Sequence, residues 1–341
     1  MASYPKVERS HIVPRTYLRN FADNDGMIGM RLVDDSRTLK VISIDHAAVW
    51  KRFYRRTRPD GTPIDDVEHS LSLLENRAGP LLRNLEERWP LDFEGKRVLG
   101  ELFAIQLLRG VRWRRGYDKR TTRLVEDYRQ SGLFDDEVAK SELTIQEVTE
   151  RNREFFASDT MRLRRMLFAS ARGSSVFGSM IWALIRFPKP VLVTADHPVT
   201  GWSRWETSSR PKPTPDGLGL MHMLEVRVPV SPTAAILMTW LDRSADIGQP
   251  FEGTRQHARN LNAFTIAQAK RQWFHLPGTE PSYGKRRAYP SLGMELFRGY
   301  GPDLVENSAL RRVVSEKVNA KLGEETNEYE IIRLDEDAKK L

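Results

Sequence analysis

Cysteine is absent from this chain of 341 residues. Without thiol groups the protein has no disulfide bonds, no thiolate nucleophile and no zinc site built on sulfur. His, Asp and Glu are then the side chains left to bind a divalent metal ion. The lack of cysteine also fits the reducing cytoplasm, so we expect a cytoplasmic protein whose site chemistry rests on imidazole and carboxylate groups.

Long hydrophobic runs and several common sequence signatures are lacking as well. The first ten residues contain no apolar segment of the signal-peptide kind, and the longest apolar stretch, 176–187, is short and interrupted by Ser179. There is no G-x-G-x-x-G after a predicted strand, no G-x-x-x-x-G-K-[ST] and no G-x-S-x-G. We expect no signal peptide and no membrane span, and the common dinucleotide, P-loop and hydrolase-elbow classes are excluded.

Positive charge is in excess, and it is unevenly placed. Lys and Arg number 54 against 46 Asp and Glu, which leaves a net charge of +8. Basic residues gather at 51–58, around Phe53 and Tyr54, and again at 109–129. Such a field attracts phosphate groups, so a nucleic acid or another polyanion is a candidate partner. The alternative is that these arginines simply keep exposed helices in water.

Apolar residues recur at helical spacing along much of the chain, and hydrophobic residues make up 40% of it. The pattern predicts a short helix within 10–22 and long helices at 65–88, from 93 to about 117, at 144–157, 158–172 and 251–275. The stretch 174–186 is apolar enough to predict a core helix. A last short helix is expected at 310–321.

Two groups of strands are expected among these helices. The runs 27–33 and 39–44 flank a polar turn and predict an N-terminal β-hairpin. The runs 191–195, 221–228 and 234–240 predict a small antiparallel sheet. The fold class is therefore α+β, mainly helical. We expect a single main domain at 1–275 and a turn-rich C-terminal extension with an acidic tail at 276–341.

The stretch 191–199 is where we expect chemistry, because a buried strand there runs into Asp196, His197 and Pro198. Successive side chains of a strand leave on opposite faces, so only one of Asp196 and His197 can face a shared site. The alternative is that Asp196 caps the turn there through its own backbone. His11 lies just before the first short helix and is free to face the same site, or to pack at the helix start.

Two predicted helices carry further candidates. Glu68 and Glu75 are seven residues apart, which brings them to one helical face beside the apolar stripe, where they could bind metal, do acid–base work or pair with arginine. Gln106 and Arg109 are one turn apart on the next helix and together could hold an anionic group. A buried guanidinium needs a carboxylate, so we expect Arg109 to pair with Glu75 or Asp196.

Several of these residues belong to an ordered set of motifs. The set comprises His11-x-Val13-Pro14-x-x-Tyr17-Leu18-x-x-Phe21, Glu68 with Glu75, Gln106-x-x-Arg109, Thr194-x-Asp196-His197-Pro198-Val199, Pro229-x-Ser231-Pro232 and Asn262. It resembles a bacterial family catalogued as domain of unknown function 4238, over residues 10–275. The resemblance implies these shared motifs and carries no reaction with it.

These observations lead to one working hypothesis and one rival. The hypothesis is a metal-assisted hydrolase or nuclease that acts on a phosphorylated or nucleic-acid substrate. Its catalytic residues would be His11, Glu68, Glu75 and Asp196, its substrate-binding residues Gln106, Arg109 and Asn262, and its divalent metal ligands His11, Glu75 and Asp196. The rival is a non-catalytic module that binds nucleic acid or protein, in which the polar residues form a structural hydrogen-bond network. Side chains that converge around an open cavity would favour the first, and full burial with mutual pairing would favour the second.

Overall fold

The computed structural model describes residues 9–35, 39–51, 56–57, 63–64, 66–109, 111–202, 223–240, 248–279 and 290–297. Its centre is a sheet with the strand order β12-β7-β11-β10-β9. The strands are β7 (Ile181–Arg186), β9 (Thr200–Trp202), β10 (Glu225–Ser231), β11 (Ala234–Thr239) and β12 (Phe251–Glu252). Neighbours are antiparallel, apart from the parallel pair β12 and β7.

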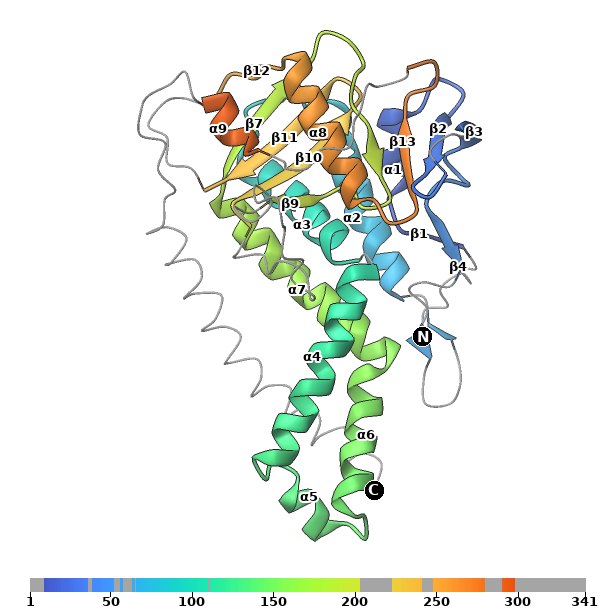
Figure 1. Ribbon diagram of the computed structural model, residues 1–341, viewed down its shortest axis with the longest axis vertical. Helices are drawn as coiled ribbons and strands as arrows, with labels where there is room; N and C mark the ends of the chain where they lie inside the picture. Colours follow the sequence, from blue (N-terminus) through green and yellow to red (C-terminus); the bar gives the residue numbers. More distant parts are fainter. Residues whose placement is uncertain are drawn as a thin grey trace.

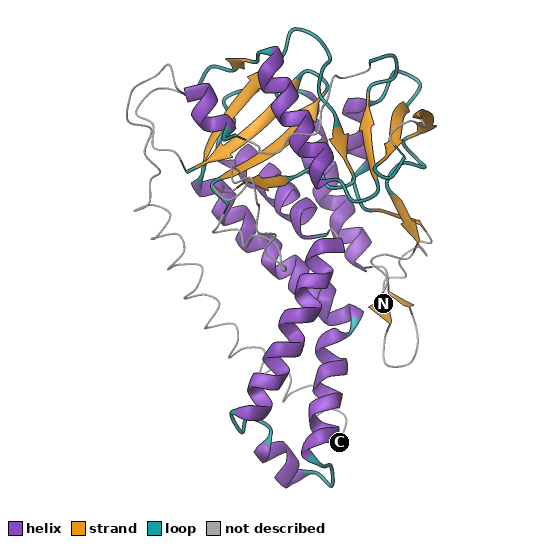
Figure 2. Ribbon diagram, in the orientation of Figure 1, coloured by secondary structure: helices purple, strands orange, loops and turns teal. Residues whose placement is uncertain are grey.

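Helices cover both faces of this central sheet (Figure 1 and Figure 2). On one face lie α2 (Asp66–Arg83), α3 (Phe93–Leu108) and α7 (Asp159–Ser179), and on the other α8 (Arg255–Gln268) and α9 (Leu292–Phe297). The described residues are thus helices packed around small, mostly antiparallel sheets. The predicted α+β class is confirmed.

The strand β7 lies in a stretch that the sequence analysis predicted to be a core helix. Trp182 and Leu184 pack into the core formed with α3 and α7, whereas Ala183 and Ile185 pack into the core formed with α8 and α9. A strand buried on both faces has no polar alternation, so from sequence it looks like a buried helix. The predicted core helix at 174–186 was therefore wrong beyond Ser179, where α7 ends.

A second sheet has the order β3-β2-β13-β8. Its strands are β2 (Met27–Leu32), β3 (Leu39–Ser43), β8 (Thr194–Ala195) and β13 (Gln272–His275). The antiparallel pairing of β2 with β3 confirms the N-terminal hairpin. The prediction that 191–195 joins the sheet of β10 and β11 was wrong, because only Thr194 and Ala195 are in a strand and they pair with β13.

Short strand pairs and a short helix complete the N-terminal half. The strand β1 (Arg9–His11) pairs with β4 (Val49–Lys51), and β5 (Arg56–Thr57) pairs with β6 (Pro63–Ile64). After β1, Pro14 occupies the N-cap of α1 (Arg15–Leu18), which continues into the 3-10 turn η1 (Arg19–Phe21). The short helix expected within 10–22 is therefore confirmed.

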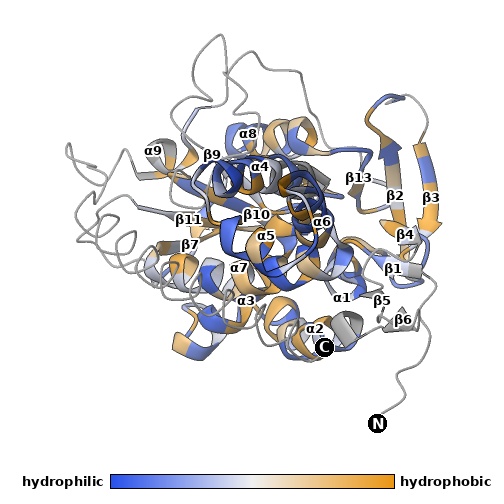
Figure 3. Cartoon of the chain, turned by 90° about the horizontal axis from the view of Figure 1, so that it is seen from below, coloured by the Kyte–Doolittle hydropathy of each residue, from blue (hydrophilic) through white to orange (hydrophobic). Residues whose placement is uncertain are grey.

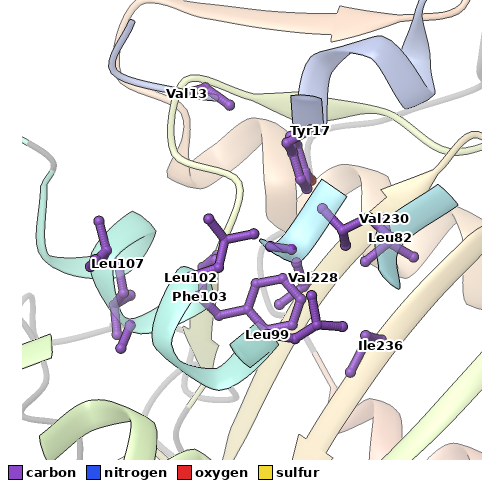
Figure 4. Close-up of a cluster of buried hydrophobic side chains, with 14 of the residues drawn as sticks. Val13, Tyr17, Leu82, Leu99, Leu102, Phe103, Leu107, Val228, Val230 and Ile236 are labelled. Atoms are coloured by element: carbon purple, nitrogen blue, oxygen red, sulfur yellow. The ribbon is translucent and has the colours of Figure 1, made fainter. Parts of the chain in front are cut away.

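The helix α1 is fixed to the core by its aromatic residue. Tyr17 lies among core side chains that include Leu102 of α3 and Val230 of β10 (Figure 4). Its hydroxyl group is 2.9 Å from the Thr194 hydroxyl oxygen and donates a hydrogen bond to the Pro229 carbonyl oxygen. Burial raises the pKa of this phenol well above its ordinary value, so it remains protonated. The chain before α2 is thereby held against both sheets.

An arm of helices projects from this body (Figure 1). It consists of α4 (Val111–Gln130), α5 (Asp135–Lys140) and α6 (Ile145–Ala157). A separate hydrophobic cluster holds it together, formed by Val125, Phe134, Val148, Phe156 and Met161. Figure 3 looks along the arm and shows hydrophilic residues over much of α4. The arm is therefore a small packed unit with a polar surface.

Two predicted helices are shorter than the sequence pattern indicated. The helix expected from 93 to about 117 is two helices, because α3 ends at Leu108 with Arg109 as its C-cap and α4 starts at Val111. The helix expected at 251–275 is only α8, which Thr254 caps at its start. Strands flank α8 on both sides. In both cases apolar residues of neighbouring elements continued the helical pattern by chance.

The remaining predictions concern the C-terminal part of the chain and membrane-spanning helices. The short helix expected at 310–321 lies outside the described residues. Within the segment that we separated as 276–341, Leu292 and Leu296 of α9 pack into the core beside α8. No helix in the described part of the chain is long and apolar enough to cross a membrane.

Candidate functional site

Arg109, the C-cap of α3, contacts the end of β1 at His11 and contacts α2 at Glu75. We use the name His11 cluster for these three residues together with Gln106, which lies one helical turn before Arg109, and Thr16, which faces α2 at Gly79. They come from the end of β1, from the adjacent helix α1, and from the more distant helices α2 and α3. Sequence reasoning selected four of them, and the structure adds Thr16.

Arg109 is the centre of the His11 cluster. Its side chain is only 2% exposed, and its Nη2 donates a hydrogen bond to the backbone carbonyl oxygen of His11. Its Nη1 lies 3.8 Å from Oε1 of Glu75, whose side chain is 21% exposed. The predicted pairing of Arg109 with Glu75 is confirmed. At 3.8 Å, however, this contact is an ion pair and too long for a hydrogen bond.

Gln106 lies one helical turn before Arg109, so the two side chains leave the same face of α3. The Gln106 side chain is 2% exposed, yet neither its amide oxygen nor its amide nitrogen has a hydrogen-bond partner among the described residues. Buried polar groups without partners cost roughly 1–3 kcal/mol each, so folded proteins rarely keep them without a reason.

Thr16 and His11 contribute two more buried polar atoms of this kind. Within the described part of the chain, Thr16 Oγ1 and His11 Nε2 have no hydrogen-bond partner. Thr16 faces α2 at Gly79, where a Cβ atom would lie 3.6 Å from its methyl group, and Gly79 is one turn beyond Glu75. The helix pair α1 and α2 therefore brings Thr16 to the same face as Glu75.

The imidazole of His11 is held in a neutral form. Burial lowers its pKa below the ordinary value of 6.5, and the positive charge of Arg15 lowers it further. Hydrogen bonds to the backbone of Asp45 and Ile44, and the charge of Asp45, oppose this shift in part. His11 Nε2 has no hydrogen-bond partner among the described residues.

Asp196 lies elsewhere and serves the backbone. Its carboxylate accepts hydrogen bonds from the backbone N–H groups of Lys270, Arg271 and Gln272, at 2.8, 2.7 and 3.3 Å. Burial raises the pKa of this carboxyl group, and the three backbone donors oppose the shift. These contacts fix the chain between α8 and β13. The carboxylate therefore has a structural partner in a distant segment of the chain, and not in its own turn as the sequence alternative expected.

Two further predicted site residues, Asn262 and Glu68, are not part of the His11 cluster as the structure describes it. The Asn262 side chain accepts from the backbone N–H of Val193 at 3.1 Å and donates to the carbonyl oxygen of Val191 at 2.7 Å. It therefore holds the segment before β8 rather than a substrate. Glu68 is in the first turn of α2, and its side chain lies outside the described residues.

The expected metal ligands are not gathered. Among the described residues, no three His, Asp or Glu side chains lie close enough together to hold a metal ion. His11 and Glu75 belong to the His11 cluster, whereas Asp196 binds backbone groups next to β13. The prediction of a three-ligand centre from His11, Glu75 and Asp196 was wrong because Asp196 follows β8 into the second sheet.

The structure contains a second set of buried polar residues, which the sequence analysis did not predict. We call it the Glu225 cluster: Glu225, Arg227, Asn260 and Ser291. Arg227 donates to Glu225 Oε2 at 2.8 Å, to Asn260 Oδ1 at 3.3 Å and to the Pro290 carbonyl oxygen at 2.8 Å. Glu225 also accepts from the Ser291 hydroxyl group and from two backbone N–H groups at the start of α9. The guanidinium carbon lies 4.8 Å from the Phe264 ring centre.

The sequence contained a signal for one of the two missed features. Glu225 and Arg227 are opposite charges two residues apart in an otherwise apolar strand, which places both on one face and indicates a buried pair. Thr16 had no such signal. It lies between Pro14 and Tyr17 of the N-terminal motif, and only the approach of α1 to α2 shows that its hydroxyl group is buried.

Comparison with known proteins identifies the family. The sequence profile of a family described as protein of unknown function (DUF4238) matches residues 9–279. The chain belongs to this family. No curated protein and no solved structure matches the chain.

Proposed function

We propose that the protein is a hydrolase that acts on a phosphorylated or nucleic-acid substrate at the His11 cluster. One observation carries the proposal: Gln106 is buried one helical turn from the buried Arg109, and neither of its amide atoms has a hydrogen-bond partner in the part of the chain that the structure describes. A structural network would satisfy these atoms, as the Glu225 cluster does. Polar groups held ready for a bound molecule leave their hydrogen-bonding capacity open until it arrives.

The residue types suit attack of water on a phosphoryl group. The Arg109 guanidinium can stabilise negative charge that builds up on the phosphoryl oxygens, and Glu75 keeps it in place from 3.8 Å. Thr16 Oγ1 adds a hydroxyl donor. The His11 imidazole can accept a proton from water near neutral pH, because burial lowers its pKa and leaves the ring unprotonated there. This assignment routes no step through a metal ion.

The rival proposal, nucleic-acid binding by the arginine-rich surface, has weaker support. On the arm, Arg129 lies 2.5 Å from Glu126, and Arg162 of α7 lies 2.9 Å from Asp118. Such pairs reduce the charge that the arm offers to phosphates. Most of the basic cluster at 51–58, and the side chains of 111–116, lie outside the described residues.

The experiment is hydrolysis by the purified full chain. The substrates are p-nitrophenyl phosphate, bis(p-nitrophenyl) phosphate, single-stranded RNA and single-stranded DNA. We expect one of them to be hydrolysed, with Arg109→Met lowering kcat/KM by about 10²-fold or more, as loss of a charge-stabilising donor does. Arg120→Met, an exposed position on α4, is the matched control and should leave the rate unchanged. Equal rates for wild type and Arg109→Met on every substrate would contradict the proposal.

A further inference from the structure

Residues 290–297, which include α9, lie beyond the part of the chain that the family profile matches, because the match ends at residue 279. The matched part nevertheless holds this segment, first through a carbonyl group. The Pro290 carbonyl oxygen accepts hydrogen bonds from Arg227 Nη2 at 2.8 Å and from Asn260 Nδ2 at 3.4 Å. Arg227 and Asn260 belong to the Glu225 cluster, and both are 0% exposed.

The Glu225 carboxylate, which is 1% exposed, binds the donors that follow in the segment. Its Oε1 accepts from the Ser291 hydroxyl group and, at 3.1 Å, from the backbone N–H of Gly293. Its Oε2 accepts from the backbone N–H of Leu292 at 3.1 Å. Most of the contacts to the segment are therefore made to its main chain. In peptide recognition, main-chain hydrogen bonds give affinity, and pockets for a few side chains give specificity.

Two leucines of the segment fill such pockets. Leu292 is 0% and Leu296 is 8% exposed, and both belong to the hydrophobic cluster that contains Leu237 of β11 and Leu261 of α8. The two leucines are four residues apart, so they lie on one face of α9. The segment thus has the features of a peptide ligand, namely two apolar anchors beside a short run of main-chain contacts.

We propose that the Glu225 cluster and the adjoining apolar surface of α8 and β11 form a peptide-docking site, and that residues 290–297 occupy it as an internal ligand that detaches while the rest of the domain stays folded. The ligand that fits has the pattern Pro-Ser-Leu-x-x-x-Leu. The cluster is satisfied because its ligand belongs to the same chain. Detachment leaves Glu225 beside Arg227, at 2.8 Å, so neither charge loses its ionic partner. The His11 cluster plays no part in this docking, so the proposal is independent of the proposed function.

The test is peptide binding to a full chain whose own segment is disabled. Leu292→Asp together with Leu296→Asp replaces both apolar anchors by charges, so the segment should leave the site while the protein keeps its circular dichroism and cooperative unfolding. A fluorescent peptide of residues 288–299 should then bind saturably. The wild type should bind it at least about tenfold more weakly, because its own segment competes at a high effective concentration. The matched control peptide carries Leu292→Ala and should bind about 30-fold or more weakly, as loss of a buried leucine side chain does.

Hydrogen exchange of the wild type gives a second measurement that needs no substitution. The amide hydrogens of Leu292 and Gly293, which bond to Glu225, should exchange at least about tenfold faster than those of β10, since the segment opens before the whole protein unfolds. Should the double variant fail to fold, this comparison decides. Equal exchange in the two regions, or a folded double variant that binds no peptide, would show that residues 290–297 are an integral part of the core and would overturn the proposal.

Discussion

Arg227 and Arg109 are buried to nearly the same extent, at 0% and 2% exposure, but their surroundings differ. Around Arg227, the carboxylate, amide and hydroxyl groups of the Glu225 cluster bond to one another or to the backbone. Around Arg109, the side chains of His11, Thr16 and Gln106 keep atoms without partners in the described part of the chain. Burial of polar residues alone thus does not indicate function. We propose that the unmet hydrogen-bonding capacity of the His11 cluster marks it as a site, whereas the satisfied bonds of the Glu225 cluster are those of a scaffold.

The largest effect should come from breaking the satisfied cluster. Arg227→Met leaves Glu225 charged and buried without its guanidinium, and removal of one member of a buried pair costs about 3–5 kcal/mol. We expect the free energy of unfolding to fall by that amount in urea denaturation. Arg129→Met removes an arginine that is 41% exposed and should change the stability by less than about 0.5 kcal/mol. Equal losses from the two variants would contradict the assignment of Arg227 to the scaffold.

Arg109→Met should cost less than Arg227→Met. Its partner Glu75 is 21% exposed, so the carboxylate that loses the arginine can be hydrated. We expect a loss of about 2 kcal/mol, below the range typical of a fully buried pair, and a clear fall in melting temperature. Arg120→Met on the exposed face of α4 should have almost no effect. A loss for Arg109→Met as large as that for Arg227→Met would show that the His11 cluster is also a scaffold.

Asp196→Asn should weaken the fold and leave the chemistry intact. An amide keeps one acceptor oxygen but presents its N–H group to backbone donors, so at least one of the bonds to Lys270, Arg271 and Gln272 is lost. We expect a loss of about 1–2 kcal/mol of stability and no change in kcat or KM. A large fall in kcat with unchanged stability would return Asp196 to the catalytic set.

The smallest effect concerns pH. The pKa of His11 is lower in the folded protein than its ordinary value of 6.5, so the unfolded chain binds more protons and stability falls as pH drops below 6.5. His11→Asn should remove this dependence, measured as melting temperature between pH 8 and about pH 5. For the wild type, kcat/KM should likewise fall on the acid side, with an apparent pKa below 6.5. An activity limb above that value would exclude His11 as the base.

The sequence correctly predicted features that depend on the residue spacing within a single helix or hairpin. The N-terminal hairpin, the helix α2 and the inward face of Gln106 and Arg109 follow from local spacing, and the structure confirms them. The pairing of Arg109 with Glu75 followed from the cost of burying a lone charge. These results depend on residues near in sequence, or on one rule of electrostatics.

The sequence was misleading for features that depend on packing between elements distant in the sequence. β7 looked like a helix because helices cover both of its faces, and Asp196 looked catalytic although its carboxylate binds the backbone that follows α8. Periodicity reports the burial of one face, and it does not report which partner covers that face. Thr16 and the Glu225 cluster likewise depend on the approach of α1 to α2 and of α9 to β10.

The most direct test of the central claim is to replace one buried amide in each cluster by an apolar side chain and to measure the free energy of unfolding. Asn260 accepts from Arg227 at 3.3 Å, so Asn260→Leu should lower the stability by about 2 kcal/mol. Gln106 has no hydrogen-bond partner in the described part of the chain, so Gln106→Met should keep or raise the stability, by up to about 2 kcal/mol, while hydrolysis is lost. If Gln106→Met is destabilised as much as Asn260→Leu, the His11 cluster is a scaffold and the account is wrong.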